Sequence, residues 1–417
     1  MFLMDLELDE HTRGNTQKKN ALFLSLAYFL SVIGDGVRTI VLPLIVLDIT
    51  NSTYFMGLIF SIETMVFIVC GMFSGAIADR MNKKYLLIGS DISRAILVLS
   101  IIPIGSGYPQ FFKIWVLIVA VLMSFAETFF RPAFFALVPE IVDEKDIDRF
   151  NSLLTTLSKG GDIIGFSLGG VLYNTLKINA LLVDGLSFLA SAAIIGTIAV
   201  TQKPMVGSNR NILKDLKEGM VFIGTNGFIR SILYYGLLMN FFSAPIMITM
   251  PALAKVLFPE KSGYVYGLMK IGSSAGVIIA GILLLSLKKI NRKTLFVLGI
   301  TGEGVAMLLL GSLQPISGQY ELILLILIAM NFILGVSVAI LNIPITSWLQ
   351  IYTPQEMRGK VKMINDVILS VPIAVSPPLF GYVLEKINIF TLLIFMGAMM
   401  TIIGFSAYFN MVEPEKG

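Results

Sequence analysis

Long apolar segments occupy most of this 417-residue chain. A helix needs about 20 apolar residues to cross the ~30 Å hydrocarbon core of a bilayer. Because 56% of the residues are hydrophobic and only 14% are charged, the sequence predicts an all-α integral membrane protein and excludes an ordinary water-soluble domain. The twelve predicted transmembrane helices lie near 21–48, 53–78, 84–105, 112–138, 150–173, 179–200, 229–256, 262–287, 294–313, 320–346, 361–384 and 389–411.

The distribution of lysine and arginine predicts the orientation of the chain. Alternate connections between the spans carry 21 basic residues on one side of the membrane and five on the other. Cytoplasmic loops are enriched in lysine and arginine. We therefore expect a multi-pass protein of the cell (cytoplasmic) membrane with both termini in the cytoplasm. The net charge of +4 reflects this topology and does not indicate nucleic-acid binding.

The spans form two halves of six, separated by a polar stretch at the midpoint. Gly89 and Gly299 hold corresponding places in the two halves, so we expect pseudo-symmetric bundles with a substrate site between them. In the polar stretch, Leu213, Leu216 and Met220 recur at the spacing of an amphipathic interfacial helix. The predicted parts are an N-terminal cytoplasmic tail (1–20), an N-terminal bundle (21–200), a linker (201–228), a C-terminal bundle (229–411) and a cytoplasmic tail (412–417).

A charged turn led by glycine joins the second and third spans. Its sequence, GAIADRMNKK at 75–84, resembles the signature loop of the major facilitator superfamily, and the resemblance covers essentially the whole chain. It implies two six-helix bundles that rock around a central site lined by helices 1, 4, 7 and 10. Four further segments resemble the branch that contains macrolide-efflux and enterobactin or siderophore-exporter proteins: 34–36, 129–132, 215–219 and 358–360.

The signature-like loop is predicted to act as a gate. Gly75 permits close helix packing, and Asp79 is placed to accept charge-assisted hydrogen bonds. The resemblance assigns Asp79 and Arg80 to a latch between the two halves. The corresponding loop of the second half, 288–293, has four cations and no acid, so only the latch of the first half is complete. Two further cations are expected at the anionic membrane surface: Lys83 and Lys84.

The fifth span carries a glycine pattern. The segment 161–170, GDIIGFSLGG, resembles the helix 5 antiporter pattern of the family, but Phe166 stands where proline is usual and one extra residue precedes the final glycines. Small residues let membrane helices approach closely. The glycines can therefore either form a packing face for a neighbouring helix or take a direct part in coupling, and both interpretations are kept. The glycines of this pattern are Gly161, Gly165, Gly169 and Gly170.

Five basic residues fall within the spans. An isolated charge at the centre of a membrane helix costs about 2.5–3.5 kcal/mol on insertion scales. Four of the five have an acid three or four residues away, where the two side chains meet on one helical face. These predicted pairs are Asp35–Arg38, Asp91–Arg94, Glu127–Arg131 and Asp162–Lys159, and the fifth residue, Lys270, has no acid at such a spacing.

Position along the helices separates the roles of these pairs. Asp91 and Arg94 lie near the predicted cytoplasmic start of span 3, and we assign them to packing at the gate. Asp35 lies near the middle of span 1. Burial favours the neutral form of a carboxylate and a nearby arginine favours the ionised form, and proton coupling needs such a balance. We hypothesise that Asp35 and Glu127 bind protons or a cationic substrate, with a purely structural role as the alternative.

Other polar residues complete the predicted set. Glu63, Glu303 and Asp366 are expected to form no ion pair within their own helices. We expect Glu303 to hydrogen-bond to a neighbouring helix or to lie near the interface, and Asp366 to contribute to the gate with Arg358. The residues predicted to line the central cavity are Asp35, Arg38, Glu63, Glu127, Arg131, Asn240, Phe241, Asn331 and Asn342.

The leading functional interpretation is secondary active export of a bulky amphipathic compound, such as a drug, a macrolide-like antibiotic or a siderophore, driven by proton exchange. The sequence has no phosphate-binding loop and its only histidine, His11, lies in the N-terminal tail. We therefore expect no enzyme activity, cofactor or metal. The expected partners are the amphipathic small molecule, protons and membrane lipid, and the expected state is a monomer. The alternatives are a lipid or lysophospholipid translocator on the same fold and a non-transporting scaffold or receptor.

Overall fold

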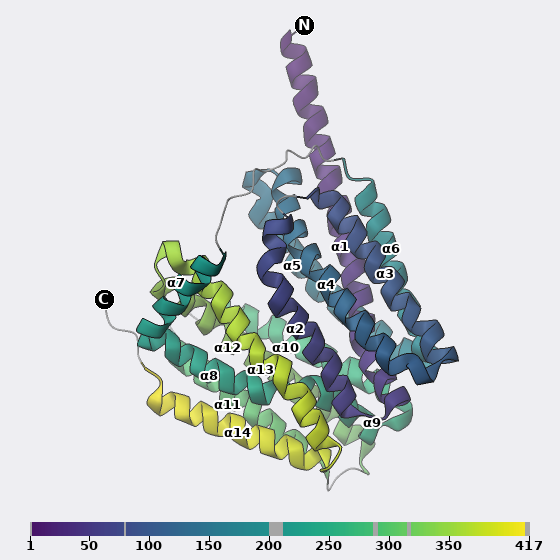
Figure 1. The fold of residues 1–417 in the computed structure, drawn as a ribbon, viewed down its shortest axis with the longest axis vertical. Coiled ribbons are helices and arrows are strands. Elements are labelled where there is room, and N and C mark those ends of the chain that lie inside the picture. Colours follow the sequence, from purple (N-terminus) through teal and green to yellow (C-terminus); the bar gives the residue numbers. More distant parts are fainter. Residues whose placement is uncertain (1, 79–80, 200–211, 287–290, 315–317, 413–417) are drawn as a thin grey trace. The chain divides into compact units, whose positions relative to one another are not determined.

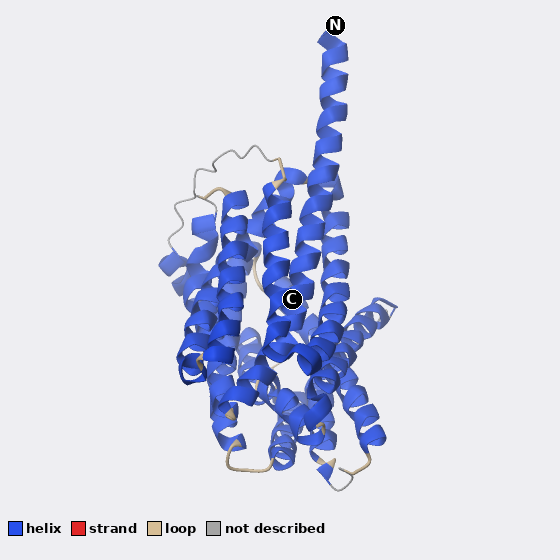
Figure 2. Ribbon diagram, turned by 90° about the vertical axis from the view of Figure 1, so that its right-hand side faces the viewer, coloured by secondary structure: helices blue, strands red, loops and turns tan. Residues whose placement is uncertain are grey.

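The computed structural model describes residues 2–78, 81–199, 212–286, 291–314 and 318–412. Every regular element in these ranges is a helix, which confirms the predicted all-α class (Figures 1 and 2). The helices are α1 (Phe2–Thr50), α2 (Thr53–Ala78), α3 (Lys83–Gly107), α4 (Pro109–Ile141), α5 (Ile147–Leu176), α6 (Leu181–Gly196), α7 (Ile212–Thr225), α8 (Gly227–Ser243), α9 (Ile246–Leu257), α10 (Ser262–Ser286), α11 (Arg292–Gly311), α12 (Tyr320–Tyr352), α13 (Arg358–Leu384) and α14 (Ile389–Asn410). Short 3-10 helices are η1 (Glu144–Asp146), η2 (Lys177–Ala180), η3 (Pro259–Lys261) and η5 (Gln355–Met357).

Eleven helical segments of the described chain are long and apolar enough to cross a membrane. One of them, Glu144–Gly196, has 53 residues, which at 1.5 Å per residue would extend about 80 Å and exceed a single crossing. The chain turns within this segment, because Lys177 ends α5 with a φ of 53°, and a right-handed helix requires a negative φ. Since α5 and α6 are separate helices, the structure agrees with the twelve predicted spans.

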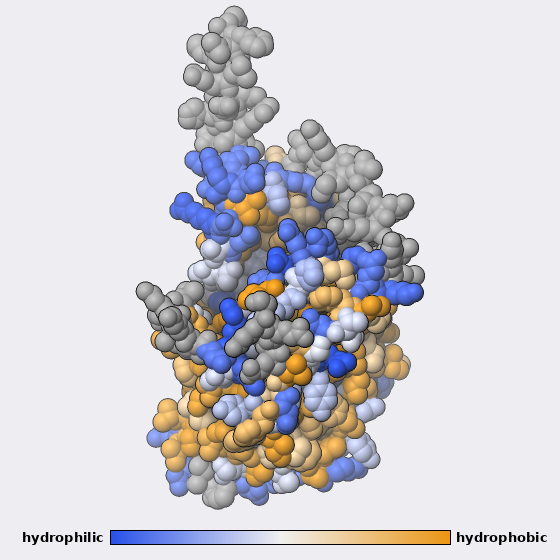
Figure 3. All heavy atoms as spheres, turned by 90° about the vertical axis from the view of Figure 1, so that its left-hand side faces the viewer, coloured by the Kyte–Doolittle hydropathy of each residue, from blue (hydrophilic) through white to orange (hydrophobic). Residues whose placement is uncertain are grey.

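Large apolar side chains are exposed on the outside of the helices. Phe135 and Phe409 are 77% and 73% exposed, and Leu22 and Ile96 are 65% and 63% exposed. Apolar side chains (orange) also cover much of the face shown in Figure 3. Contiguous apolar surface of this extent is unusual in soluble monomers and suits a lipid environment. The chain is therefore a multi-pass membrane protein.

The chain divides into two compact units. The N-terminal unit comprises Met1–Leu42 and Val69–Ser208, and the C-terminal unit comprises Pro43–Ile68 and Asn209–Gly417. In the N-terminal unit, α3 packs against α4 and α6. In the C-terminal unit, α11 packs against α12 and α14, α10 packs against α12, and α13 packs against α7 and α8. Each unit thus has its own set of tightly packed membrane helices.

The first part of α2 belongs to the C-terminal unit because it packs on α13. Thr53 donates a hydrogen bond of 2.8 Å from Oγ1 to the carbonyl of Gly381, and Ser61 donates to the carbonyl of Ala374. These two α2 residues are eight apart and lie on one helical face. An ion pair between Asp48 and Lys255 ties the end of α1 to α9 in the same unit. Polar contacts thus attach the first α1–α2 turn to the helices of the C-terminal half.

The segment between the halves contributes α7, which packs against α13. Lys360 at the start of α13 forms an ion pair with Glu218 on α7. A Cβ added at Gly219 would lie 2.3 Å from Cδ1 of Ile364, so the two helices approach closely at this glycine. The described part of this segment, from residue 212 onwards, is thus helical and attached to the C-terminal unit.

Candidate functional site

Ionisable side chains from α1 and α6 meet inside the N-terminal unit. Arg38 Nη2 lies 2.6 Å from Asp35 Oδ1, one turn away on α1, as the sequence predicts. Arg38 Nε lies 3.0 Å from Oδ2 of Asp184 on α6. Asp184 is fully buried, whereas the side chain of Asp35 is 36% exposed. One arginine therefore bridges an accessible carboxylate and a buried one.

A second pair on α3 is fully enclosed. Asp91 and Arg94 form the predicted ion pair, and Ser191 on α6 donates a hydrogen bond of 2.7 Å to Asp91 Oδ2. The guanidinium of Arg94 lies 4.3 Å from the ring centroids of both Phe130 on α4 and Phe188 on α6. Stacking between two aromatic rings stabilises a desolvated cation. This pair joins α3, α4 and α6, and its predicted assignment to the gate stays a prediction.

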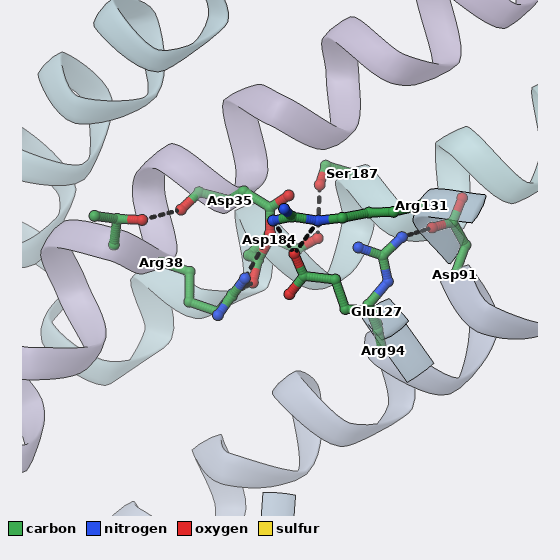
Figure 4. A network of polar contacts seen from close by, with 9 residues as sticks. Asp35, Arg38, Asp91, Arg94, Glu127, Arg131, Asp184 and Ser187 are labelled. Carbon is green, nitrogen blue, oxygen red and sulfur yellow. Dashed lines mark hydrogen bonds and ion pairs between the residues drawn. The ribbon is translucent and has the colours of Figure 1, made fainter. Parts of the chain in front are cut away.

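A third pair lies on α4. Arg131 Nη2 and Nε donate hydrogen bonds of 2.6 and 3.0 Å to Glu127 Oε1. The side chain of Arg131 is 71% exposed and that of Glu127 is 39% exposed. Glu127 also interacts electrostatically with Arg38 and Arg94, so the three pairs belong to one group of charges (Figure 4). We call this group the charged cluster: Asp35, Arg38, Asp91, Arg94, Glu127, Arg131 and Asp184.

The charged cluster contains more acids than bases. Four carboxylates, on Asp35, Asp91, Glu127 and Asp184, interact with the guanidinium groups of three arginines. With every member ionised, the cluster has a net charge of −1. Intramembrane charges are normally balanced by a partner. The arrangement therefore has room for one additional positive charge, which a proton or a cationic group can supply.

Asp184 is the member of the cluster that the sequence analysis missed. It is the only charged residue between Lys177 and Lys203, and a lone acid in an apolar span is itself a signal of function. No basic residue lies at helical spacing from it, so its partner could not be predicted locally. Its ion pair with Arg38 joins residues 146 positions apart and depends on how α1 and α6 pack.

The glycines of α5 line its contact with α1. A Cβ added at Gly165 would lie 2.5 Å from the carbonyl oxygen of Ile33 and 2.8 Å from Cα of Gly36. Gly161 and Gly169 lie one turn to either side and approach Val32 and Val37 of α1 in the same way. Gly170 is also buried. The structure thus gives these glycines a packing surface, and a direct role in coupling stays a prediction.

The signature-like loop is described only at its margins. Gly75 lies in the last turn of α2, and Asp79 and Arg80 fall outside the described residues. Lys83 is buried and forms an ion pair with Glu140 at the end of α4. Lys84 donates hydrogen bonds of 2.7 Å to the carbonyls of Gly196 and Ile198 just after α6. Cations satisfy free carbonyls at helix C-termini, so these two lysines bind protein groups and not only the membrane surface.

In the C-terminal unit, two of the predicted lining residues border a cavity. Asn240 on α8 and Asn331 on α12 line it, and the other residues at this cavity include Ser243, Lys270 and Glu303. Glu303 is buried and accepts a hydrogen bond from Ser243 Oγ. The prediction that Glu303 hydrogen-bonds to a neighbouring helix is confirmed.

Two further predicted lining residues of this unit make other contacts. The ring of Phe241 packs 5.2 Å from that of Phe242 and 5.6 Å from that of Phe380, measured between centroids. Asn342 is exposed and donates a hydrogen bond to the carbonyl of Val338 on its own helix. Neither residue is among those that border the cavity at Glu303.

Two residues predicted for the gate, Arg358 and Asp366, lie in the N-terminal part of α13, and their gate role stays a prediction. Asp366 was expected to form no ion pair within its helix, and this is wrong, because Lys362 Nζ lies 2.8 Å from Asp366 Oδ2. The pair has the favourable spacing of four residues that the sequence analysis overlooked. Arg358 Nε donates a hydrogen bond of 3.3 Å to the carbonyl of Thr353 at the turn before α13.

The sequence and the fold are both similar to those of known membrane transporters. The family model described as Major Facilitator Superfamily matches residues 24–361. The chain belongs to the major facilitator superfamily. Among solved structures of this type, the nucleoside transporter NupG superposes with a TM-score of 0.75 at 12% identity and covers 94% of this chain and 99% of its own. A bacterial homolog of the human lysosomal transporter Spinster has a TM-score of 0.65 at 14% identity, with 93% and 95% coverage.

Several curated superfamily relatives are export proteins. Macrolide efflux protein A of Streptococcus pyogenes is 23% identical over 369 residues, which cover 86% of this chain and 88% of the relative. Multidrug efflux pump Tap of Mycolicibacterium fortuitum is 25% identical over 369 residues, with 83% and 85% coverage. The putative bacilysin exporter BacE of Bacillus subtilis is 26% identical over 223 residues and covers about half of each chain. The chain is therefore a transporter-family protein similar to efflux proteins.

Proposed function

We propose that this protein is a proton-coupled exporter of a bulky amphipathic compound that works by alternating access of its two six-helix halves. In this proposal it acts as a monomer in the cytoplasmic membrane with both termini in the cytoplasm. The substrate class rests on the macrolide and multidrug efflux relatives, which align over more than four-fifths of the chain.

The observation that carries the coupling is the uneven charge of the charged cluster. Four carboxylates and three guanidinium groups leave one negative charge without a cation. A proton neutralises this charge in one state, and a cationic substrate group can replace it in another. Asp35 and Glu127 are the accessible acids of the cluster, with 36% and 39% of their side-chain surface exposed. They are the groups through which proton and substrate compete, and Asp184 supplies the buried excess charge.

The test is uptake of a radiolabelled macrolide by cells whose own efflux systems are deleted, with and without a protonophore. The wild-type protein should lower accumulation, and the protonophore should abolish this effect. Asp184→Asn makes the cluster neutral, so accumulation should rise to the level of cells without the protein. Asp143→Asn changes an exposed acid before η1 and should behave like the wild type.

Two outcomes would contradict the proposal. Protonophore-insensitive export would remove proton drive, and equal export by Asp184→Asn and the wild type would remove the cluster from coupling. A labelled lysophospholipid should be assayed in parallel in reconstituted vesicles. Movement of that lipid without any macrolide export would favour a lipid translocator on the same fold.

A further inference from the structure

The cavity of the C-terminal unit surrounds a buried acid that the proposed coupling does not use. Its volume is about 240 Å³, which is ample for several water molecules. It is bordered by α8, α9, α10, α11, α12 and α13. Its polar lining residues are Asn240, Ser243, Tyr266, Lys270, Ser273, Glu303 and Asn331.

Glu303 differs from every acid of the charged cluster in its partner. Glu303 is only 3% exposed. Within the described chain, its one side-chain hydrogen bond comes from the hydroxyl of Ser243. No ion pair to Glu303 occurs among the described residues, although Lys270 lines the same cavity. A buried carboxylate without a cation is costly as the anion. The environment of Glu303 therefore favours its neutral, protonated form, and its carboxyl group can gain and lose a proton.

The hydrogen-bond donor to Glu303 lies at a break between two helices. Ser243 is the last residue of α8, and α9 begins at Ile246 after Ala244 and Pro245. Pro245 has no N–H, so it cannot form the usual bond to the carbonyl four residues earlier, at Phe241. The chain bonds here at shorter spacing, with Met247 N–H donating to Ala244 O at 3.0 Å. Pro245 therefore kinks the span Gly227–Leu257 beside Glu303.

The rest of the cavity wall is closely packed. A Cβ added at Gly335 on α12 would lie 1.9 Å from the carbonyl oxygen of Ser273 on α10. A Cβ at Gly276 on α10 would lie 2.1 Å from the carbonyl oxygen of Phe332. The backbones of α10 and α12 therefore touch, and Asn331 and Lys270 are held on a fixed frame. In the α8–α9 segment, by contrast, Pro245 leaves the carbonyl of Phe241 without its usual N–H donor.

We propose that Glu303 is a proton-binding residue, and that the α8–α9 break controls its exchange through Ser243. In the protonated state the acid is neutral inside the unit. On release, its proton passes to water in the cavity, and the carboxylate is stabilised by the Ser243 hydroxyl and by the positive charge of Lys270 across the cavity. Lys270 and Tyr266, both on α10, are the other titratable groups that line this space; the ammonium lies 5.8 Å from the centroid of the tyrosine ring.

The direct test of this site needs no substrate. The purified full-length protein, reconstituted in lipid, is titrated while infrared difference spectra record the C=O stretch of protonated carboxyl groups. We expect one band that disappears in Glu303→Gln and shifts in frequency in Ser243→Ala, which removes the hydroxyl partner. Glu321→Gln, at the exposed start of α12, is the matched control and should leave the band unchanged. A spectrum that is the same in Glu303→Gln and the wild type overturns the proposal.

Transport by the same variants tests the link to coupling, and this part rests on the proposed function. In vesicles, Glu303→Gln should lose accumulation of labelled macrolide driven by a pH gradient but keep exchange of macrolide without a gradient. Equal loss of both activities would show a structural role and overturn the coupling part of the proposal. If the wild type moves no macrolide, the proposed function fails, and the infrared band still decides whether Glu303 binds a proton.

Discussion

The charged cluster of the N-terminal unit and the cavity of the C-terminal unit give their acids different partners. In the N-terminal unit, Asp35, Asp91, Glu127 and Asp184 each lie beside an arginine. In the C-terminal unit, Glu303 is buried against a serine hydroxyl. A nearby cation favours the charged form of a carboxylate, whereas a hydroxyl leaves most of the cost of burying that charge uncompensated. The buried carboxylates of the N-terminal unit are thus held by guanidinium groups, whereas the buried carboxylate of the C-terminal unit is held by a hydroxyl.

The largest expected effect comes from removing the central cation of the charged cluster. Arg38→Met leaves buried Asp184 without its arginine, and breaking a buried ion pair in this way costs about 3–5 kcal/mol. Glu303→Gln should cost less than about 1 kcal/mol, because glutamine keeps a hydrogen bond with Ser243. The measurement is the midpoint of thermal unfolding in detergent, with Arg38→Met/Asp184→Asn as the compensating double variant.

The outcome of these variants sharpens the contrast between the units. The double variant should unfold at a higher temperature than Arg38→Met alone, since it no longer buries an unpaired carboxylate. If Glu303→Gln lowers the midpoint as much as Arg38→Met does, Glu303 is an ionised structural group. The acids of the two units then contribute equally to stability, and the contrast between them is wrong.

An intermediate effect is expected where Arg94 in the N-terminal unit and Lys270 in the C-terminal unit contact aromatic rings. Arg94 lies between Phe130 and Phe188, both at 4.3 Å, so Arg94→Lys should lose about 1–2 kcal/mol of cation–π and stacking energy. The matched change in the C-terminal unit is Lys270→Arg, near Tyr266 at 5.8 Å, where we expect less than about 0.5 kcal/mol. Thermal unfolding of the two variants measures the difference. Equal shifts of the midpoint would show that the stacking of Arg94 between two rings does not stabilise the protein more than the contact of Lys270 does.

Local spacing explains which parts of the charged cluster the sequence could predict. The pairs Asp35–Arg38, Asp91–Arg94, Glu127–Arg131 and Lys159–Asp162 each lie within one helical turn, and all four are confirmed. Helix geometry alone brings such side chains together, whatever the neighbouring helices do. The span positions were predictable for a related reason, because the thickness of the bilayer fixes the length of an apolar helix.

Residue spacing within one helix does not predict contacts between helices. The partners of Asp184 and Glu303, on α1 and α8, depend on the rotation of each helix about its own axis. Those rotations follow from close packing at glycines that hydropathy does not reveal, such as Gly34 on α1, which packs against Ser187 on α6, and Gly304 on α11, which packs against Thr401 on α14. The sequence predicts one span at 229–256, and the interruption of that span at Pro245 beside Glu303 emerges only when α8 and α11 are brought together in space.

The smallest stability effects, and the sharpest functional contrast, are expected at two similar ion pairs. Glu127–Arg131 and Lys362–Asp366 both have a spacing of four residues and are largely exposed, one in each unit. Exposed helical pairs contribute about 0.3–0.5 kcal/mol, so Glu127→Gln and Asp366→Asn should shift thermal unfolding equally little. Glu127 also interacts with two further arginines, Arg38 and Arg94. Macrolide accumulation in vesicles driven by a pH gradient should therefore fail in Glu127→Gln and persist in Asp366→Asn. Equal loss in both variants would contradict this contrast and support the predicted gate role of Asp366.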